Sequence, residues 1–238
     1  MKTLVSSQFS PVVGLVQANL LELENFTVTS FPVWPLGCNC SIIECKSSKE
    51  AIVVDPGGEE EKILKVLKER GLTVSRIVHT HAHFDHCLGT HGLAEGLREV
   101  NPNAEIQIGL HQGDSFLYRN LGMQCGWFGL PPMDAKEAIN LDLEDGMELP
   151  VGNHRLHVLH TPGHTPGSCC FSVEGLVFSG DTLFAGGIGR TDLPGGDSEA
   201  ILKSIRGRLF TLDDGTAVIP GHGGFTRIYE EKHSNPFF

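Results

Sequence analysis

Four residues that commonly bind metal ions lie within six consecutive positions of this chain. The segment HTHAHFDH, which begins at residue 79 after a predicted β-strand, contains His81, His83, Asp85 and His86. In an extended segment, alternate side chains point to the same side. The first two histidines can therefore face one point, while the aspartate and the last histidine turn toward a neighbouring one. The segment predicts a loop that serves two metal ions, with a histidine-rich surface loop as the alternative.

Three further candidate ligands follow later predicted strands. His164 lies in TPGHTPGS, Asp181 in SGDT and His222 in PGHG. Each of these segments is a turn just after a strand, and a rigid sheet can hold several such loops around one site. The sequence therefore predicts one metal site to which four separate loops contribute.

Strand and helix signals occur in two groups along the chain. Predicted strands cover residues 27–34, 40–45, 51–54, 76–78, 147–151, 154–160, 169–173, 176–179 and 217–219. Predicted helices cover residues 59–70, 89–99, 198–209 and 225–232. This order predicts two packed sheets with helices outside them. We expect a single domain over residues 26–238, with residues 1–25 as an N-terminal extension or edge strand. Tyr118, Trp127 and Phe128 are interpreted as core residues, with the lining of a substrate channel as the alternative.

Charge and cysteine content restrict the partners and the compartment. The net charge of −11, without a basic cluster, argues against nucleic-acid binding, which depends on Lys and Arg. The seven cysteines are odd in number and form no CxxC pair, which favours a reduced, cytoplasmic protein. The weak apolar stretch at residues 12–21 is too short to span a membrane, although a cleaved leader is an alternative. We expect a small-molecule substrate, no nucleic-acid or membrane partner, and make no prediction of oligomeric state.

The motifs resemble those of the metallo-β-lactamase superfamily and, within it, the short, single-domain relatives of glyoxalase II. The resemblance runs from about residue 35 to residue 238. It is carried by HTHAHFDH, TPGHTPGS, GDTLF, GRTDLPGGD and PGHG. It implies an α+β protein with the αββα fold, a two-sheet β-sandwich with helices on both outer faces.

The resemblance also implies how the ligands are divided between two divalent cations. One cation is held by His81, His83 and His164, the other by Asp85, His86 and His222, and Asp181 bridges both. Imidazole and carboxylate ligands suit Zn²⁺, Fe²⁺ or Mn²⁺. Zinc is the expected metal, with iron or manganese as alternatives.

The implied activity is hydrolysis of a thioester of the hydroxyacylglutathione type by a hydroxide that bridges the metals. Asp85 is the candidate catalytic residue, since it can also accept a hydrogen bond from the bridging water. Arg190, in the GRTD segment, is a candidate substrate contact. Asp55 and Thr165 are candidates for fixing the imidazole rings of the ligands. For Asp55, simple turn formation is an equal alternative.

Several other functions remain open from the sequence. An iron-dependent persulfide dioxygenase and a lactonase share the ligand frame, and a binding protein could keep the metals only for stability. A β-lactamase is not expected, because that branch usually carries Cys at the position of Asp181. Glyoxalase II has a tyrosine two residues beyond its last histidine ligand, where this chain has Gly224. This departure weakens the case for glutathione thioesters.

Overall fold

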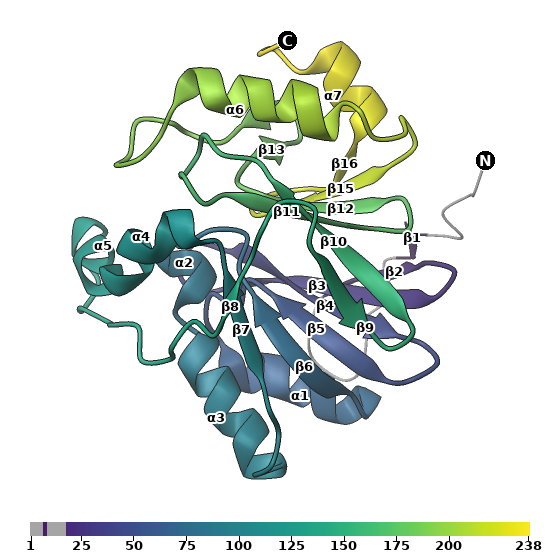
Figure 1. The fold of residues 1–238 in the computed structure, drawn as a ribbon, viewed down its shortest axis with the longest axis vertical. Coiled ribbons are helices and arrows are strands. Elements are labelled where there is room, and N and C mark those ends of the chain that lie inside the picture. The colour runs from purple at the N-terminus through teal and green to yellow at the C-terminus, as the bar shows by residue number, and fades with distance from the viewer. Residues whose placement is uncertain (1–6, 9–17) are drawn as a thin grey trace.

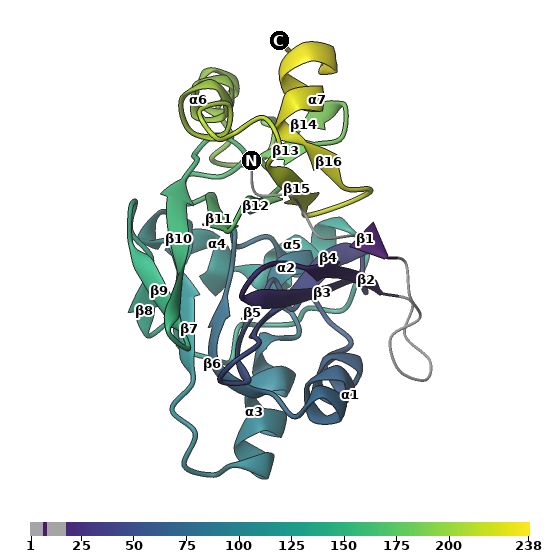
Figure 2. The same cartoon turned by 90° about the vertical axis from the view of Figure 1, so that its right-hand side faces the viewer.

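The computed structural model describes residues 7–8 and 18–238 of the chain. Two β-sheets pack face to face, and helices cover the outer face of each sheet (Figure 1). Figure 2, turned by 90°, shows the same layers from the side, with helices below the first sheet and above the second. The αββα arrangement expected from the motifs is therefore confirmed.

The first sheet changes from antiparallel to parallel halfway across. Among the described residues its strands are, in spatial order, β1 (Ser7–Gln8), β2 (Asn19–Glu22), β3 (Phe26–Val33), β4 (Cys38–Cys45), β5 (Glu50–Val54), β6 (Thr73–Val78), β7 (Gln107–Leu110) and β8 (Leu141–Asp142). Neighbours from β1 to β5 are antiparallel, and those from β5 to β8 are parallel. The carboxyl ends of β5, β6 and β7 consequently share one edge of the sheet.

The second sheet places three strand ends at a common edge. Its described strands are, in spatial order, β16 (Thr226–Arg227), β15 (Ala217–Pro220), β12 (Leu176–Gly180), β11 (Cys169–Val173), β10 (His154–His160) and β9 (Glu148–Val151). Strands β12 and β15 are parallel, while β11 is antiparallel to both β10 and β12. Strands β10, β12 and β15 therefore run in the same direction. A short hairpin, β13 (Leu183–Phe184) and β14 (Gly187–Ile188), follows β12.

Three apolar cores separate the four layers. Successive residues of a strand face opposite sides of the sheet. In β4, Ile43 belongs to the core between the sheets, whereas Ile42 belongs to the core beneath the helices. The helices on the first sheet are α1 (Glu60–Arg70) and α3 (Thr90–Val100), and those on the second are α6 (Ser198–Ser204) and α7 (Ile228–Ser234). A third core joins α6, its π-helical extension η2 (Ile205–Leu209) and α7 to the second sheet.

Helix α1 follows the sequence prediction closely. It has glutamates in its first turn and basic residues in its last turn, where they complement the helix dipole. Gly71 ends the helix with a φ of 65°, a left-handed conformation that favours glycine. Its buried residues are Ile63, Val66 and Leu67, while Leu64 is only half-buried. The helix expected at 198–209 is α-helical only to Ser204.

Two sequence expectations concern the N-terminal segment and three aromatic residues between β7 and β8. Part of the expected N-terminal segment, β1 and β2, lies at the edge of the first sheet, while residues 1–6 and 9–17 lie outside the described residues. In the described ranges, no helix combines the length and apolar character needed to cross a bilayer. Tyr118 is buried as expected, but the core assignment is wrong for Trp127 and Phe128. Each is nearly half exposed, because each lies at the carboxyl end of α5 (Leu121–Trp127) with one side toward solvent.

Candidate metal centre

The predicted ligands all follow the carboxyl ends of strands at one edge of the sandwich. Strand β6 leads into HTHAHFDH, whose last part forms the short helix α2 (Phe84–Cys87). His164 follows β10, Asp181 follows β12, and His222 follows β15. Because these strand ends meet at a shared edge, four loops that are distant in sequence come together there.

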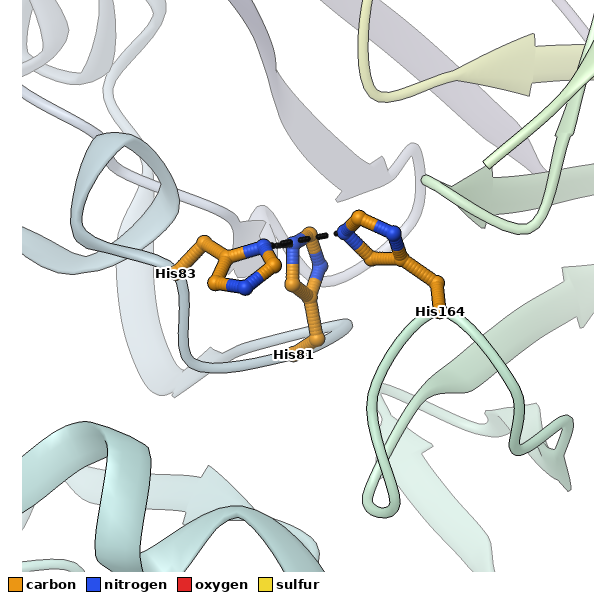
Figure 3. A group of neighbouring side chains, drawn as sticks. All are labelled: His81, His83 and His164. Atoms are coloured by element: carbon orange, nitrogen blue, oxygen red, sulfur yellow. Dashed lines mark hydrogen bonds between the residues drawn. The ribbon is translucent and has the colours of Figure 1, made fainter. Parts of the chain in front are cut away.

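One group contains three histidines from two loops. Nδ1 of His83 lies 3.1 Å from Nε2 of His81 and 2.9 Å from Nε2 of His164. The rings point toward one another, as Figure 3 shows. Burial, reinforced by the neighbouring imidazoles, lowers the pKa of His83 to about 3 and the pKa of His81 well below its usual value. The nitrogen lone pairs of these two rings are therefore free to bind a cation near neutral pH.

A second group lies beside the first and contains a carboxylate. Nε2 of His222 lies 3.1 Å from Oδ2 of Asp85 and 3.3 Å from Nε2 of His86. Burial alone would raise the pKa of Asp85, but the neighbouring His86 and His222 lower it to about 2. Burial alone would lower the pKa of His222, but its hydrogen bond to Asp85 raises it. These contacts therefore keep Asp85 ionised and favour a proton on His222, whereas burial disfavours a proton on His81 and His83.

Asp181 lies between the two groups. Its Oδ2 is 3.6 Å from Nε2 of His164, and its Oδ1 is 3.6 Å from Nε2 of His86 and 3.8 Å from Nε2 of His222. Within the described ranges, Oδ1 is one of two buried side-chain polar atoms that lack a hydrogen-bond partner. Leaving a buried carboxylate oxygen without a partner is costly. Oδ1 of Asp181 therefore fits the role of a cation ligand. The full set of donors fits a pair of divalent cations.

Asp55 orients two of the ligand rings. Its Oδ2 lies 3.0 Å from Nδ1 of His86 and accepts a hydrogen bond of 2.6 Å from Oγ1 of Thr80. A carboxylate only accepts, so His86 carries its proton on Nδ1 and presents the lone pair of Nε2 to the site. Oγ1 of Thr80 in turn lies 3.1 Å from Nδ1 of His81, which fixes that ring in the same tautomer. Cys38 Sγ also lies on the Nδ1 side of His86, at 3.3 Å, away from the other ligands.

The loop of His164 has different supports from those expected. Nδ1 of His164 donates to the carbonyl oxygen of Arg190 at 2.8 Å, which leaves its Nε2 free for a cation. The Arg190 guanidinium is exposed and makes a two-point ion pair with Asp192, with both distances 2.7 Å. The Thr165 hydroxyl reaches no imidazole and instead donates to Oδ2 of Asp114 at 2.8 Å. Thr165 therefore supports the loop rather than a ring.

Sequence reasoning missed Asp114 and Gln124, which lie between β7 and β8 and form hydrogen bonds with the first ligand loop. Gln124, on α5, accepts from the backbone N–H of Phe84 and donates to the carbonyl oxygen of Ala82, both at 3.1 Å. Burial raises the pKa of Asp114. The hydrogen bonds that Asp114 accepts from the two ligand loops oppose this rise. Neither residue lies in a ligand motif, and their partners are mostly backbone atoms, so no spacing in the sequence indicates them.

Comparisons with known proteins agree with this geometry. The sequence profile of the metallo-beta-lactamase superfamily matches residues 33–222. The hydroxyacylglutathione hydrolase GloC of Haemophilus influenzae is 40% identical over 220 residues, which cover 91% of this chain and 98% of that protein. The crystal structure of the BLEG-1 B3 metallo-beta-lactamase superposes with a TM-score of 0.78 at 34% identity, covering 88% of this chain and 98% of that one. The structure of TTHA1623 in a di-iron-bound form gives 0.76 at 37% identity, covering 87% and 98%.

A more distant relative carries a different activity in its name. The mitochondrial persulfide dioxygenase ETHE1 of Bos taurus is 31% identical over 198 residues, covering 80% of this chain and 67% of that protein. The two-sheet sandwich, the histidine and aspartate cluster at its edge and the similarity to GloC together identify a metallo-hydrolase. The chain belongs to the metallo-beta-lactamase superfamily, and within it resembles the short members related to glyoxalase II.

Proposed function

We propose that the chain hydrolyses thioesters of the hydroxyacylglutathione type with two divalent cations. The observation that carries this proposal is the convergence of two ligand groups with Asp181 between them. The identity of 40% to GloC supports the thioester class. Zinc is the expected metal, since imidazole and carboxylate donors suit it, and the similarity to a protein with a di-iron form keeps iron as the first alternative.

Each of the two ligand groups would hold one cation. One set is His81, His83 and His164, the other is Asp85, His86 and His222, and Asp181 reaches both. Bound cations would lower the pKa of a coordinated water and stabilise negative charge on a carbonyl oxygen. Hydrogen bonds to the Asp55 carboxylate and to the Arg190 carbonyl oxygen keep the rings of His86 and His164 in the required tautomers.

We assign the catalytic role to Asp85. Its carboxylate is almost fully buried, and Oδ2 hydrogen-bonds to Nε2 of His222. With a pKa of about 2 it remains ionised and accepts hydrogen bonds, so it orients a proton donor rather than retaining the proton. A thioester needs no strong general acid, because a thiolate leaves readily. The Asp85→Asn variant should therefore lose turnover more strongly than it loses metal.

Arg190 is assigned to substrate binding. Its backbone carbonyl oxygen accepts a hydrogen bond from His164, and its side chain is 56% exposed. An arginine that can exchange its partner Asp192 for a substrate carboxylate would favour acidic thioesters. Arg190→Ala should raise KM about tenfold or more while changing kcat little, because a hydrogen bond to a charged group is worth roughly 1.5–3 kcal/mol. An unchanged KM would remove this assignment.

A panel of substrates tests the proposed activity against its rivals. Anaerobically purified protein is analysed for metal and then assayed with S-lactoylglutathione, a γ-lactone, a chromogenic cephalosporin, and glutathione persulfide with an oxygen electrode. The cephalosporin is included because a B3 metallo-beta-lactamase is 34% identical to the chain. We expect the highest kcat/KM for the thioester. Oxygen uptake without thioester hydrolysis would identify a dioxygenase, and bound metal without turnover would favour a binding protein.

We further propose a cytoplasmic protein with a small-molecule substrate and no nucleic-acid or membrane partner. All seven cysteines are free and buried, which supports a reducing compartment. The acidic net charge of −11 argues against a polyanionic partner. Cell fractionation with an antibody to the native protein tests the location.

A further inference from the structure

Asp114 connects the two loops that supply the three-histidine group. It is the last residue of the 3₁₀ turn η1 (Gln112–Asp114), and its side chain is fully buried. Oδ2 accepts hydrogen bonds from the backbone N–H of Ala82 at 2.9 Å and from the hydroxyl of Thr165 at 2.8 Å. Oδ1 accepts from the backbone N–H of Gly167 at 2.6 Å. One carboxylate on η1 thus forms hydrogen bonds with both ligand loops.

Two of the three partners of Asp114 are immediate neighbours of cation ligands. Ala82 lies between His81 and His83, and Thr165 follows His164 directly. The two loops share no strand and come from different sheets. Their relative position determines whether the three histidine nitrogens stand at ligand spacing.

We propose that Asp114 is a positioning residue that holds the two loops of the three-histidine group together before a cation binds. The proposal rests on the proposed metal centre but not on the thioester substrate. Without this link, cation binding would have to order the loops against each other. The conformational entropy lost in that ordering would reduce the apparent affinity.

The glycines around Asp114 show that the close approach is built into the backbone. A Cβ on Gly167 would lie 2.7 Å from both Cγ and the backbone nitrogen of Asp114. A Cβ on Gly113 would lie 3.0 Å from the backbone nitrogen of Gly167. Only residues without a side chain permit this packing at Gly167, which gives the last glycine of TPGHTPGS a structural reason.

The position requires a carboxylate rather than an amide. Two of its three partners, Ala82 and Gly167, are backbone N–H groups, which only donate. The third, Thr165, can itself accept a hydrogen bond from Oγ of Ser168 at 2.7 Å while it donates to Asp114. An asparagine of the same size would turn its NH₂ group toward at least one donor and lose that hydrogen bond. Asp114→Asn is therefore a test that changes acceptors without creating a cavity.

The experiment measures Zn²⁺ binding to chelator-stripped protein by competition with a chromogenic chelator. Asp114→Asn should weaken the three-histidine site by about tenfold to a hundredfold, the usual effect of losing a support of a metal ligand. Thr165→Val, which removes one of the three donors, should weaken it less. The matched control is Glu44→Gln, since Glu44 is also a buried carboxylate. It pairs with Lys49 and Arg70 at the end of β4 that is remote from the metal centre. The control should lower stability to urea and leave Zn²⁺ affinity unchanged.

Spectroscopy of the Co²⁺-substituted protein distinguishes positioning from general stability. The visible absorption of Co²⁺ reports ligand geometry, and it should change in Asp114→Asn but not in Glu44→Gln. A folded Asp114→Asn protein with the wild-type Zn²⁺ affinity would overturn the proposal. If that variant does not fold, a wild-type affinity in Thr165→Val would overturn it instead, as would an equal loss of affinity in the control. A wild-type chain that binds no divalent cation would overturn the metal centre together with this proposal.

Discussion

Replacing Asp55 by asparagine preserves the size of the side chain but changes its hydrogen-bond acceptors. In the structure, Oδ1 accepts from the backbone N–H of Thr80 at 2.7 Å, and Oδ2 accepts from the Thr80 hydroxyl and from Nδ1 of His86. If the asparagine oxygen keeps the backbone contact, its NH₂ group faces Nδ1 of His86. The ring must then accept at Nδ1 and carry its proton on Nε2, which is the nitrogen that faces the other ligands.

Two magnitudes follow from this rearrangement. Hydrogen bonds to a buried charged group contribute roughly 1.5–3 kcal/mol each, so the net loss of one of them should lower the free energy of unfolding of the cation-free protein by about 1.5–3 kcal/mol. Losing the partner that orients a metal-binding histidine costs about tenfold to a hundredfold in affinity. At about 1.4 kcal/mol for each tenfold change, that is roughly 1.4–2.8 kcal/mol of binding free energy. The larger effect should fall on the group that contains His86, because Asp55 contacts that ring directly and reaches His81 only through Thr80.

Zn²⁺ titration of chelator-stripped Asp55→Asn, with urea unfolding in parallel, measures both quantities. We expect one of two binding steps to weaken about tenfold to a hundredfold and the other to change only a few-fold. Glu44→Gln serves again as the buried carboxylate remote from the centre. The reasoning is refuted if Asp55→Asn loses stability while both affinities match the wild type.

Three further predictions concern space, protons and metal removal. In Gly221→Ala, the new Cβ would lie 2.1 Å from Oδ1 of Asp181. We therefore expect a loss of about 1–3 kcal/mol in stability and weaker cation binding. A cation affinity equal to that of the wild type, measured by titration, would contradict this prediction. Because the pKa of His222 is raised and that of His83 is lowered to about 3, protons compete with the cation mainly at the second group. Dialysis from about pH 8 to about pH 6 should therefore release one cation before the other, and simultaneous release would argue against this. Chelation should lower thermal stability, since a free cation at a hundred times its Kd stabilises the native state by about 2.7 kcal/mol; an unchanged midpoint in calorimetry is the contrary result.

The fold and the ligand residues could be predicted because their signals are local. The alternation of Ile42 and Ile43 into separate cores reflects the strand period, and the glycine end of α1 follows from its capping sequence. The ligands form short motifs at strand ends, where the geometry of the sheet brings loops together. Very short elements such as β13 and β14 contain too few residues to show a period.

Asp55 was a candidate from the sequence, but most other supports of the site could not be predicted, because their partners are distant or are backbone atoms. Asp114 and Gln124 bind N–H and C=O groups of the ligand loops, which every sequence possesses. Thr165 was expected to contact an imidazole, yet its partner is the Asp114 carboxylate, which lies on another loop. Trp127 and Phe128 looked like core residues by type, but exposure depends on which neighbours cover α5.

The most direct test of the paired-cation centre is elemental analysis of protein purified without chelators and without oxygen. The geometry predicts about two divalent cations per chain, with His164→Ala and His222→Ala each losing about one. A wild-type chain without bound cations, or variants that keep the full content, would contradict the assignment of these side chains as ligands.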